Sequence, residues 1–150
     1  GREIATRLGL DWDEMISSRR CSLCTPDELR AMAARGIDLQ LHTHRHRFPA
    51  DERETRREVE DNRESLARVL PGAYDHLCYP SSEHDPEQFP WLRSLGVKSG
   101  TTCEPGLNPP GTEPLELRRF LDGECVSAIE FEAEMSGFAE LLRRAVRRLR

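Results

Sequence analysis

Several common sequence features are scarce or missing in this chain of 150 residues. No run approaches the roughly 20 apolar residues of a membrane-spanning helix, so the sequence predicts no transmembrane segment. The first residues, Gly-Arg-Glu, contain neither a Met start nor a signal-peptide pattern, which leaves the location open between cytoplasm and cell envelope. The five cysteines are odd in number and irregularly spaced, which argues against a disulfide framework and favours reduced thiols.

Positive charge is not in excess either. The chain has 22 Lys and Arg residues against 27 Asp and Glu residues, a formal net charge of −5. An acidic domain is a poor candidate for binding the phosphate backbone, so we expect no nucleic-acid partner. The Arg-rich end, RRAVRRLR, is interpreted as the solvated face of an amphipathic helix.

Strands alternate with helices along the chain. Thr25, Pro26 and Glu28 form the pattern of a capped helix start, and Gly36 is a helix stop. The alternation predicts parallel βα units in an α/β fold, whose sites form in the loops after the carboxyl ends of the strands. The expected strands span 37–41, 76–80, 96–102 and 115–121. One or two short helices are expected within 3–20, and further helical segments at 25–35, 48–70, 90–95 and 127–149.

Three of the five histidines, His42, His44 and His46, follow the first expected strand directly. Neutral imidazole is a common transition-metal ligand. His42 and His46 can both point to one ion if the chain turns and Thr43 holds the turn, with His44 pointing elsewhere. They would supply two ligands of a divalent metal, zinc in the first place, and a carboxylate or histidine from another strand end would supply the third. The competing interpretation is an exposed loop whose histidines only titrate.

This region resembles a known family. LRAMAARGIDLQLHTHRHRFP, residues 29–49, resembles the second motif of the NodB-homology polysaccharide deacetylases, His-Ser/Thr-x-x-His at the end of a barrel strand. His42, Thr43 and His46 match it. CYPSSEHDPE, residues 78–87, resembles the third motif, and FPWLRSLGVKSGTT, residues 89–102, resembles the helix and strand that follow. The resemblance covers residues 25–103.

The resemblance implies a fold and a chemistry. The fold would be a partial distorted (β/α) barrel of the NodB type, a TIM-like barrel. The activity would be metal-dependent removal of acetyl groups from an N-acetylated or O-acetylated polysaccharide or oligosaccharide. Tyr79 and Pro80 would line the active-site groove. Apart from the resemblance, His84 is a candidate general acid, and Trp91, for which core packing is the alternative, would contact the sugar together with Tyr79.

The chain also departs from the family. The first motif, Thr-Phe-Asp-Asp, which would supply the base and the third metal ligand, is absent, because no Asp-Asp pair occurs. The third motif lacks the usual Arg before it and Gly after it, and the late Leu-x-x-His motif is missing since His84 is the last histidine. Arg118 or Arg119 could instead order the site. We therefore expect residues 1–150 to be the carboxyl-terminal portion of a single deacetylase-like domain, inactive by itself.

Two alternatives stay open. Cys21 and Cys24, followed by His42 and His46, have the composition of a structural zinc site, although the 17-residue gap is longer than a zinc finger uses. The chain could also be a carbohydrate-binding remnant of the deacetylase fold without catalysis.

Overall fold

The computed structural model describes residues 1–20 and 22–149. These residues form two compact units, Gly1–Ile37 and Asp38–Arg150. The first unit is helical and contains α1 (Arg2–Arg7), α2 (Trp12–Ser18) and α3 (Pro26–Ala34). The capping box predicted for α3 is confirmed, because the Thr25 hydroxyl accepts from the Glu28 N–H and the Glu28 side chain accepts from the Thr25 N–H.

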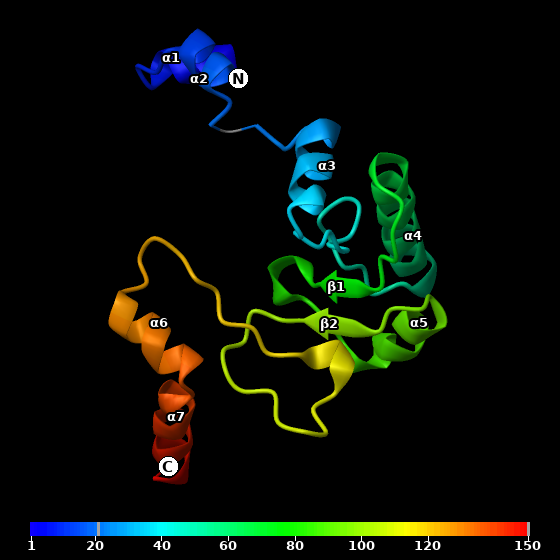
Figure 1. The fold of residues 1–150 in the computed structure, drawn as a ribbon, viewed down its shortest axis with the longest axis vertical. Coiled ribbons are helices and arrows are strands. Elements are labelled where there is room, and N and C mark those ends of the chain that lie inside the picture. Colours follow the sequence, from blue (N-terminus) through cyan, green and yellow to red (C-terminus); the bar gives the residue numbers. More distant parts are fainter. Residues whose placement is uncertain (21, 150) are drawn as a thin grey trace. The chain divides into compact units, whose positions relative to one another are not determined.

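The second unit is built on a small parallel sheet (Figure 1). β1 (His76–Cys78) pairs with β2 (Ser99–Thr101), and Leu77 lies opposite Gly100. Single parallel bridges add Leu41 beside Leu77 and Leu117 beside Thr101. The expected parallel order of the four segments is therefore confirmed, and the fold is α/β. A barrel around this sheet stays a prediction.

The outer two segments are shorter than the strands expected at 37–41 and 115–121. Next to Leu41, the Gln40 side-chain oxygen accepts from the Asp75 and His76 N–H groups at 3.1 and 3.0 Å. These amides are thus satisfied by a side chain, and the regular main-chain ladder stops. Before Leu117, the chain turns through a 3₁₀ helix, η3 (Pro114–Glu116), which leaves a single bridge.

Two helices cover the sheet and close its core. α4 (Glu52–Val69) begins at Asp51, whose carboxylate accepts from the Glu54 N–H. It starts a few residues later than expected and ends before Pro71, as expected. Between β1 and β2 the chain forms η1 (Pro80–Ser82), η2 (Pro86–Gln88) and α5 (Phe89–Ser94). The core consists of Leu41, Val59, Tyr74, Leu77, Tyr79, Phe89, Leu92, Val97 and Leu115.

The last two helices expose apolar side chains. α6 (Ala128–Met135) and α7 (Phe138–Arg148) confirm the expected helical end of the chain. The apolar face predicted for α7 lies in solvent, and the buried residue of this helix is Glu140, which is paired with Arg143 and Arg144. The exposed apolar side chains are Ile129, Phe131, Met135, Phe138, Leu141, Leu142, Val146 and Leu149. Among the residues described, every helix is too short or too polar to span a bilayer.

Gly100 packs against the ring of Tyr79, which makes it sensitive to substitution. A Cβ at Gly100 would lie 2.6 Å from the Tyr79 hydroxyl oxygen and 2.7 Å from a ring carbon. Gly100→Ala should therefore lower the free energy of unfolding by about 1–3 kcal/mol, the usual cost of overpacking. Urea unfolding checks this, with Gly123→Ala as the control, because a Cβ at Gly123 meets nothing within 4 Å. Equal stability of both variants would contradict the packing described here.

Candidate active site

His42 and His46 lie together at the carboxyl end of the Leu41 segment. Their ring centroids are 4.9 Å apart, with the rings edge to face. The His42 Nδ1 lies 2.7 Å from the Cys78 carbonyl oxygen, which can only accept. Nδ1 therefore carries the proton, and the lone pair of Nε2 is left free, which is the tautomer that a metal ligand needs.

The turn between these histidines has an uncommon backbone. Thr43 and His46 adopt φ angles of 60° and 54°, and Ser81 and Ser82, in the loop after β1, adopt 54° and 64°. Of the five described non-glycine residues with positive φ, these four lie in the two loops that match the family motifs. Such conformations cost free energy and cluster at functional sites. The Thr43 hydroxyl accepts from the Arg47 N–H, as expected for a residue that holds the turn.

A buried carboxylate fixes the histidine loop to α4. The side chain of Glu58 is 1% exposed. It accepts from the Arg45 N–H at 2.8 Å, from the Arg45 Nη1 at 3.1 Å and from the Arg47 Nε at 3.1 Å. Burial alone would raise the pKa of Glu58, but these hydrogen bonds outweigh it and hold the pKa below its usual value. Arg45 also pairs with Asp61 and lowers the pKa of that carboxyl.

The same helix supplies two further contacts. The Asn62 side-chain oxygen accepts from the His42 N–H at 2.9 Å, four residues after Glu58 on the same face of α4. His44 points away from the pair, since its Nδ1 lies 3.4 Å from the Ser65 hydroxyl. Glu58 and Asn62 were not predicted from the sequence, although their spacing of four residues beside the buried Val59 indicates an inward-facing stripe.

The donor set fits two ligands of a divalent metal ion. Both imidazoles approach each other at the end of a strand segment, and His42 is in the right tautomer. Within residues 1–20 and 22–149, no group of three or more His, Cys, Asp or Glu side chains has a metal-binding arrangement. Of the alternative zinc ligands, Cys24 is exposed and Cys21 lies outside the described residues.

Tyr79 and His84 form a stack beside this loop. Tyr79 is fully buried, and its hydroxyl donates to the Leu115 carbonyl oxygen at 2.8 Å. Burial raises the pKa of this phenol far above its usual value. His84 stacks on Tyr79 with ring centroids 5.0 Å apart, and its Nδ1 lies 2.9 Å from the Ser82 carbonyl oxygen. Its Nε2 faces Glu116 at 3.4 Å. Pro80 is buried and begins η1.

Two neighbouring features complete the site. Trp91 is half-buried and lines a shallow pocket of about 300 Å³ together with His84. Arg119 contacts the loop after β2, with its Nε 3.2 Å from the Thr102 carbonyl oxygen and its Nη2 3.3 Å from the Cys103 Sγ. Arg118 lines a second pocket, which also contains His84.

Comparison with protein-family models decides the family. The model described as polysaccharide deacetylase matches residues 8–100, which include the histidine loop and the loop after β1. The chain belongs to the polysaccharide deacetylase family. The resemblance inferred from the two motif loops is thereby confirmed. A comparison with curated proteins found no significant match.

Solved deacetylases have a similar fold. The Streptococcus pyogenes deacetylase PplD, in complex with acetate, is 20% identical with a TM-score of 0.69 over 81% of this chain and 54% of its own. IcaB from Ammonifex degensii is 23% identical with a TM-score of 0.61, covering 69% and 49%. BC0361, a polysaccharide deacetylase from Bacillus cereus, is 19% identical with a TM-score of 0.62, covering 74% and 36%. The chain thus spans about half or less of each structure, and the likeness shows the fold.

Proposed function

We propose that this chain is the carboxyl-terminal portion of a metal-dependent deacetylase domain that removes acetyl groups from an acetylated polysaccharide. The observation that carries the proposal is the pair of His42 and His46 at a strand end, with the His42 Nδ1 proton fixed on the Cys78 carbonyl. A partial (β/α) barrel agrees with the parallel sheet and its crossover helices. The aspartate pair of the family would come from outside these 150 residues.

In this proposal His42 and His46 hold the ion, with zinc as the first candidate. When bound, the ion would polarise the acetyl carbonyl and lower the pKa of the attacking water. Glu58 and Asn62 keep the loop in place, since both bond to its main chain. The Ser81 amide, at a positive φ in the loop after β1, is the candidate donor to the oxyanion.

The remaining residues have distinct roles. His84 is the candidate general acid, because Ser82 fixes its Nδ1 proton and Glu116 supports a proton at Nε2. Tyr79 is proposed to act through His84, whose ring it supports, and Pro80 sets the turn that follows β1. Trp91 offers a ring face to the sugar beside His84.

The test compares a longer polypeptide, which contains an upstream aspartate pair, with residues 1–150 alone. Acetate release is measured from an N-acetylated chitooligosaccharide and from an O-acetylated xylan, before and after chelation and zinc repletion. We expect release from one of them by the longer polypeptide, loss on chelation, recovery with zinc, and no release by residues 1–150.

Two outcomes would overturn this proposal. X-ray absorption that finds sulfur neighbours around the bound metal would establish the structural zinc site of Cys21, Cys24, His42 and His46 instead. Glycan binding without acetate release by the zinc-loaded longer polypeptide would establish a carbohydrate-binding remnant.

A further inference from the structure

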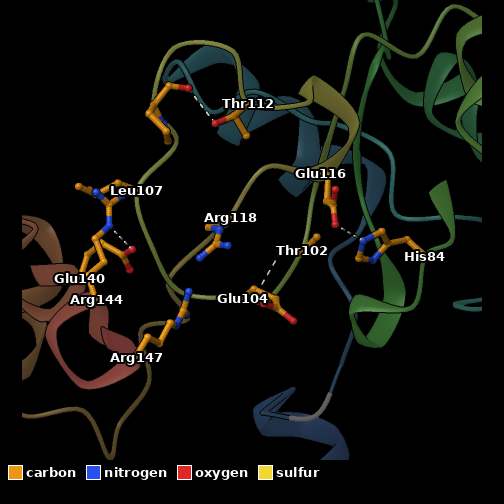
Figure 2. A pocket seen from close by; sticks show the side chains of 11 residues that line it. His84, Thr102, Glu104, Leu107, Thr112, Glu116, Arg118, Glu140, Arg144 and Arg147 are labelled. Atoms are coloured by element: carbon orange, nitrogen blue, oxygen red, sulfur yellow. Dashed lines mark hydrogen bonds and ion pairs between the residues drawn. The ribbon is translucent and has the colours of Figure 1, made fainter. Parts of the chain in front are cut away.

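A second pocket lies next to the candidate active site and shares His84 with it. Its volume is about 420 Å³. Figure 2 shows its walls: His84 and Glu116 on one side, Arg118 in the middle, and Arg147 from α7 on the other side. His84 also lines the shallow pocket of Trp91, so a glycan chain could occupy both pockets at once.

Two guanidinium groups in this pocket have no carboxylate partner within the described part of the chain. Arg144 is paired with Glu140 at 2.9 Å, whereas neither Arg118 nor Arg147 forms an ion pair there. Arginines that line one concave space and have no ion-pair partner can bind an anion, although Glu104, Glu116 and Glu140 line the same pocket. What distinguishes Arg118 and Arg147 is that both line the same pocket.

Arg118 is held in place by its surroundings. Its N–H donates to the Asn108 Oδ1 at 2.8 Å, and the Asn108 Nδ2 donates to the Arg118 carbonyl oxygen at 2.9 Å. Gly106, at φ 144°, gives the guanidinium room, since a Cβ there would lie 2.8 Å from the Arg118 Nη1. The main chain of Arg118 is therefore fixed by Asn108, and its side chain packs against Gly106.

The pocket also has acceptors. Glu104 and Glu116 add carboxylates to its lining, and Thr102 and Thr112 add hydroxyl groups. Carboxylates are good acceptors for sugar hydroxyl groups, and guanidinium groups bind carboxylates or phosphates through two parallel hydrogen bonds. The mixture of acceptors with unpaired cations matches a sugar that carries both hydroxyl groups and an acid group.

We propose that this pocket binds an acidic sugar residue of the substrate, with Arg118 and Arg147 holding its carboxylate or phosphate and the glutamates accepting from its hydroxyl groups. The proposal rests on the proposed function, because it names an acidic acetylated glycan as the substrate class. The sugar in this pocket would lie next to the residue being deacetylated, on the far side of His84.

Isothermal titration of the longer polypeptide tests the pocket. The probes are tetragalacturonate for a carboxylate, glucosamine 6-phosphate for a phosphate, and chitotetraose as the neutral comparison. We expect one acidic probe to bind at least about 10-fold more tightly than chitotetraose, with the preference falling as salt rises. Arg118→Ala and Arg147→Ala should each weaken that binding about 10-fold, the scale of a charge-assisted hydrogen bond.

Matched variants keep the outcome interpretable. Arg148→Ala removes the neighbouring arginine of α7, which does not line the pocket, and should leave the affinity unchanged. Arg118→Lys keeps the charge but not the bidentate geometry, so it should recover only part of the affinity. Circular dichroism confirms that each variant is folded.

These measurements test the acidic-sugar pocket separately from the proposed deacetylase activity. Acid-selective binding that survives His42→Ala but not Arg118→Ala supports the pocket even if no acetate is released. Equal affinity for acidic and neutral probes, or an Arg118→Ala variant that binds like the wild type, overturns it.

Discussion

His42→Ala and His46→Ala should each remove the bound metal from the longer polypeptide and nearly abolish acetate release. Each imidazole is one of the two ligands proposed for the ion, and their ring centroids lie 4.9 Å apart. Metal content, measured by mass spectrometry, should fall from about one ion per chain to near zero. The rate should fall by about 10³-fold or more, since the metal supplies several kcal/mol of transition-state stabilisation.

His44→Ala is the matched control for this experiment. His44 lies in the same loop and is equally exposed, but its ring is directed to Ser65 on α4. The variant should keep its metal and its rate within a small factor. If His44→Ala lost the metal as fully as His46→Ala, or if His42→Ala kept it, the assignment of the ligand pair would be wrong.

Glu58→Ala should be strongly destabilising, and it should also impair metal binding. The buried carboxylate accepts three hydrogen bonds from Arg45 and Arg47, whose side chains are 37% and 54% exposed. The free energy of unfolding, from urea titration at neutral pH, should fall by about 2 kcal/mol, because the hydrogen bonds to a charged group are lost while both guanidinium groups can be hydrated. Glu60→Ala, on the exposed side of the same helix, should stay within about 0.5 kcal/mol of the wild type.

The contribution of Glu58 should depend on pH in a defined direction. Its pKa in the folded protein lies below the ordinary value of 4.5, because the hydrogen bonds outweigh the effect of burial. The stabilisation is therefore fully present above about pH 4.5 and is lost as the pH falls through the lowered pKa. The stability difference between wild type and Glu58→Gln should shrink in acid. A difference that grew as the pH fell would contradict the role given to Glu58.

Local patterns in the sequence predicted the elements and the histidine pair well. The capping box at Thr25 and Glu28 depends on neighbouring residues alone, so it could be predicted without the rest of the fold. The spacing of His42 and His46, after an apolar segment, likewise predicted that both rings would meet. The parallel order followed from the alternation of apolar runs and helices.

Structural features that depend on contacts between residues far apart in the chain could not be predicted from the sequence. α4 is so rich in charge that it resembles a solvated helix, and only the loop folded over it makes Glu58 a buried residue. The lengths of the outer strands were overestimated, because the side chain of Gln40 replaces main-chain pairing beside Leu41. The periodicity of α7 predicted an apolar face correctly but contained no information about whether that face would be covered.

The sheet described above has a consequence for the order of events during folding. Contacts across it join His42 to Cys78, His76 to Ser99, and Thr102 to Leu117, which are 36, 23 and 15 residues apart in the chain. Such non-local pairings form slowly, whereas helices stabilised by neighbouring residues form within about a microsecond. Helical circular dichroism should therefore recover early in refolding. The capacity to capture a metal ion should return last, because the His42 ring is oriented only after β1 has docked beside Leu41.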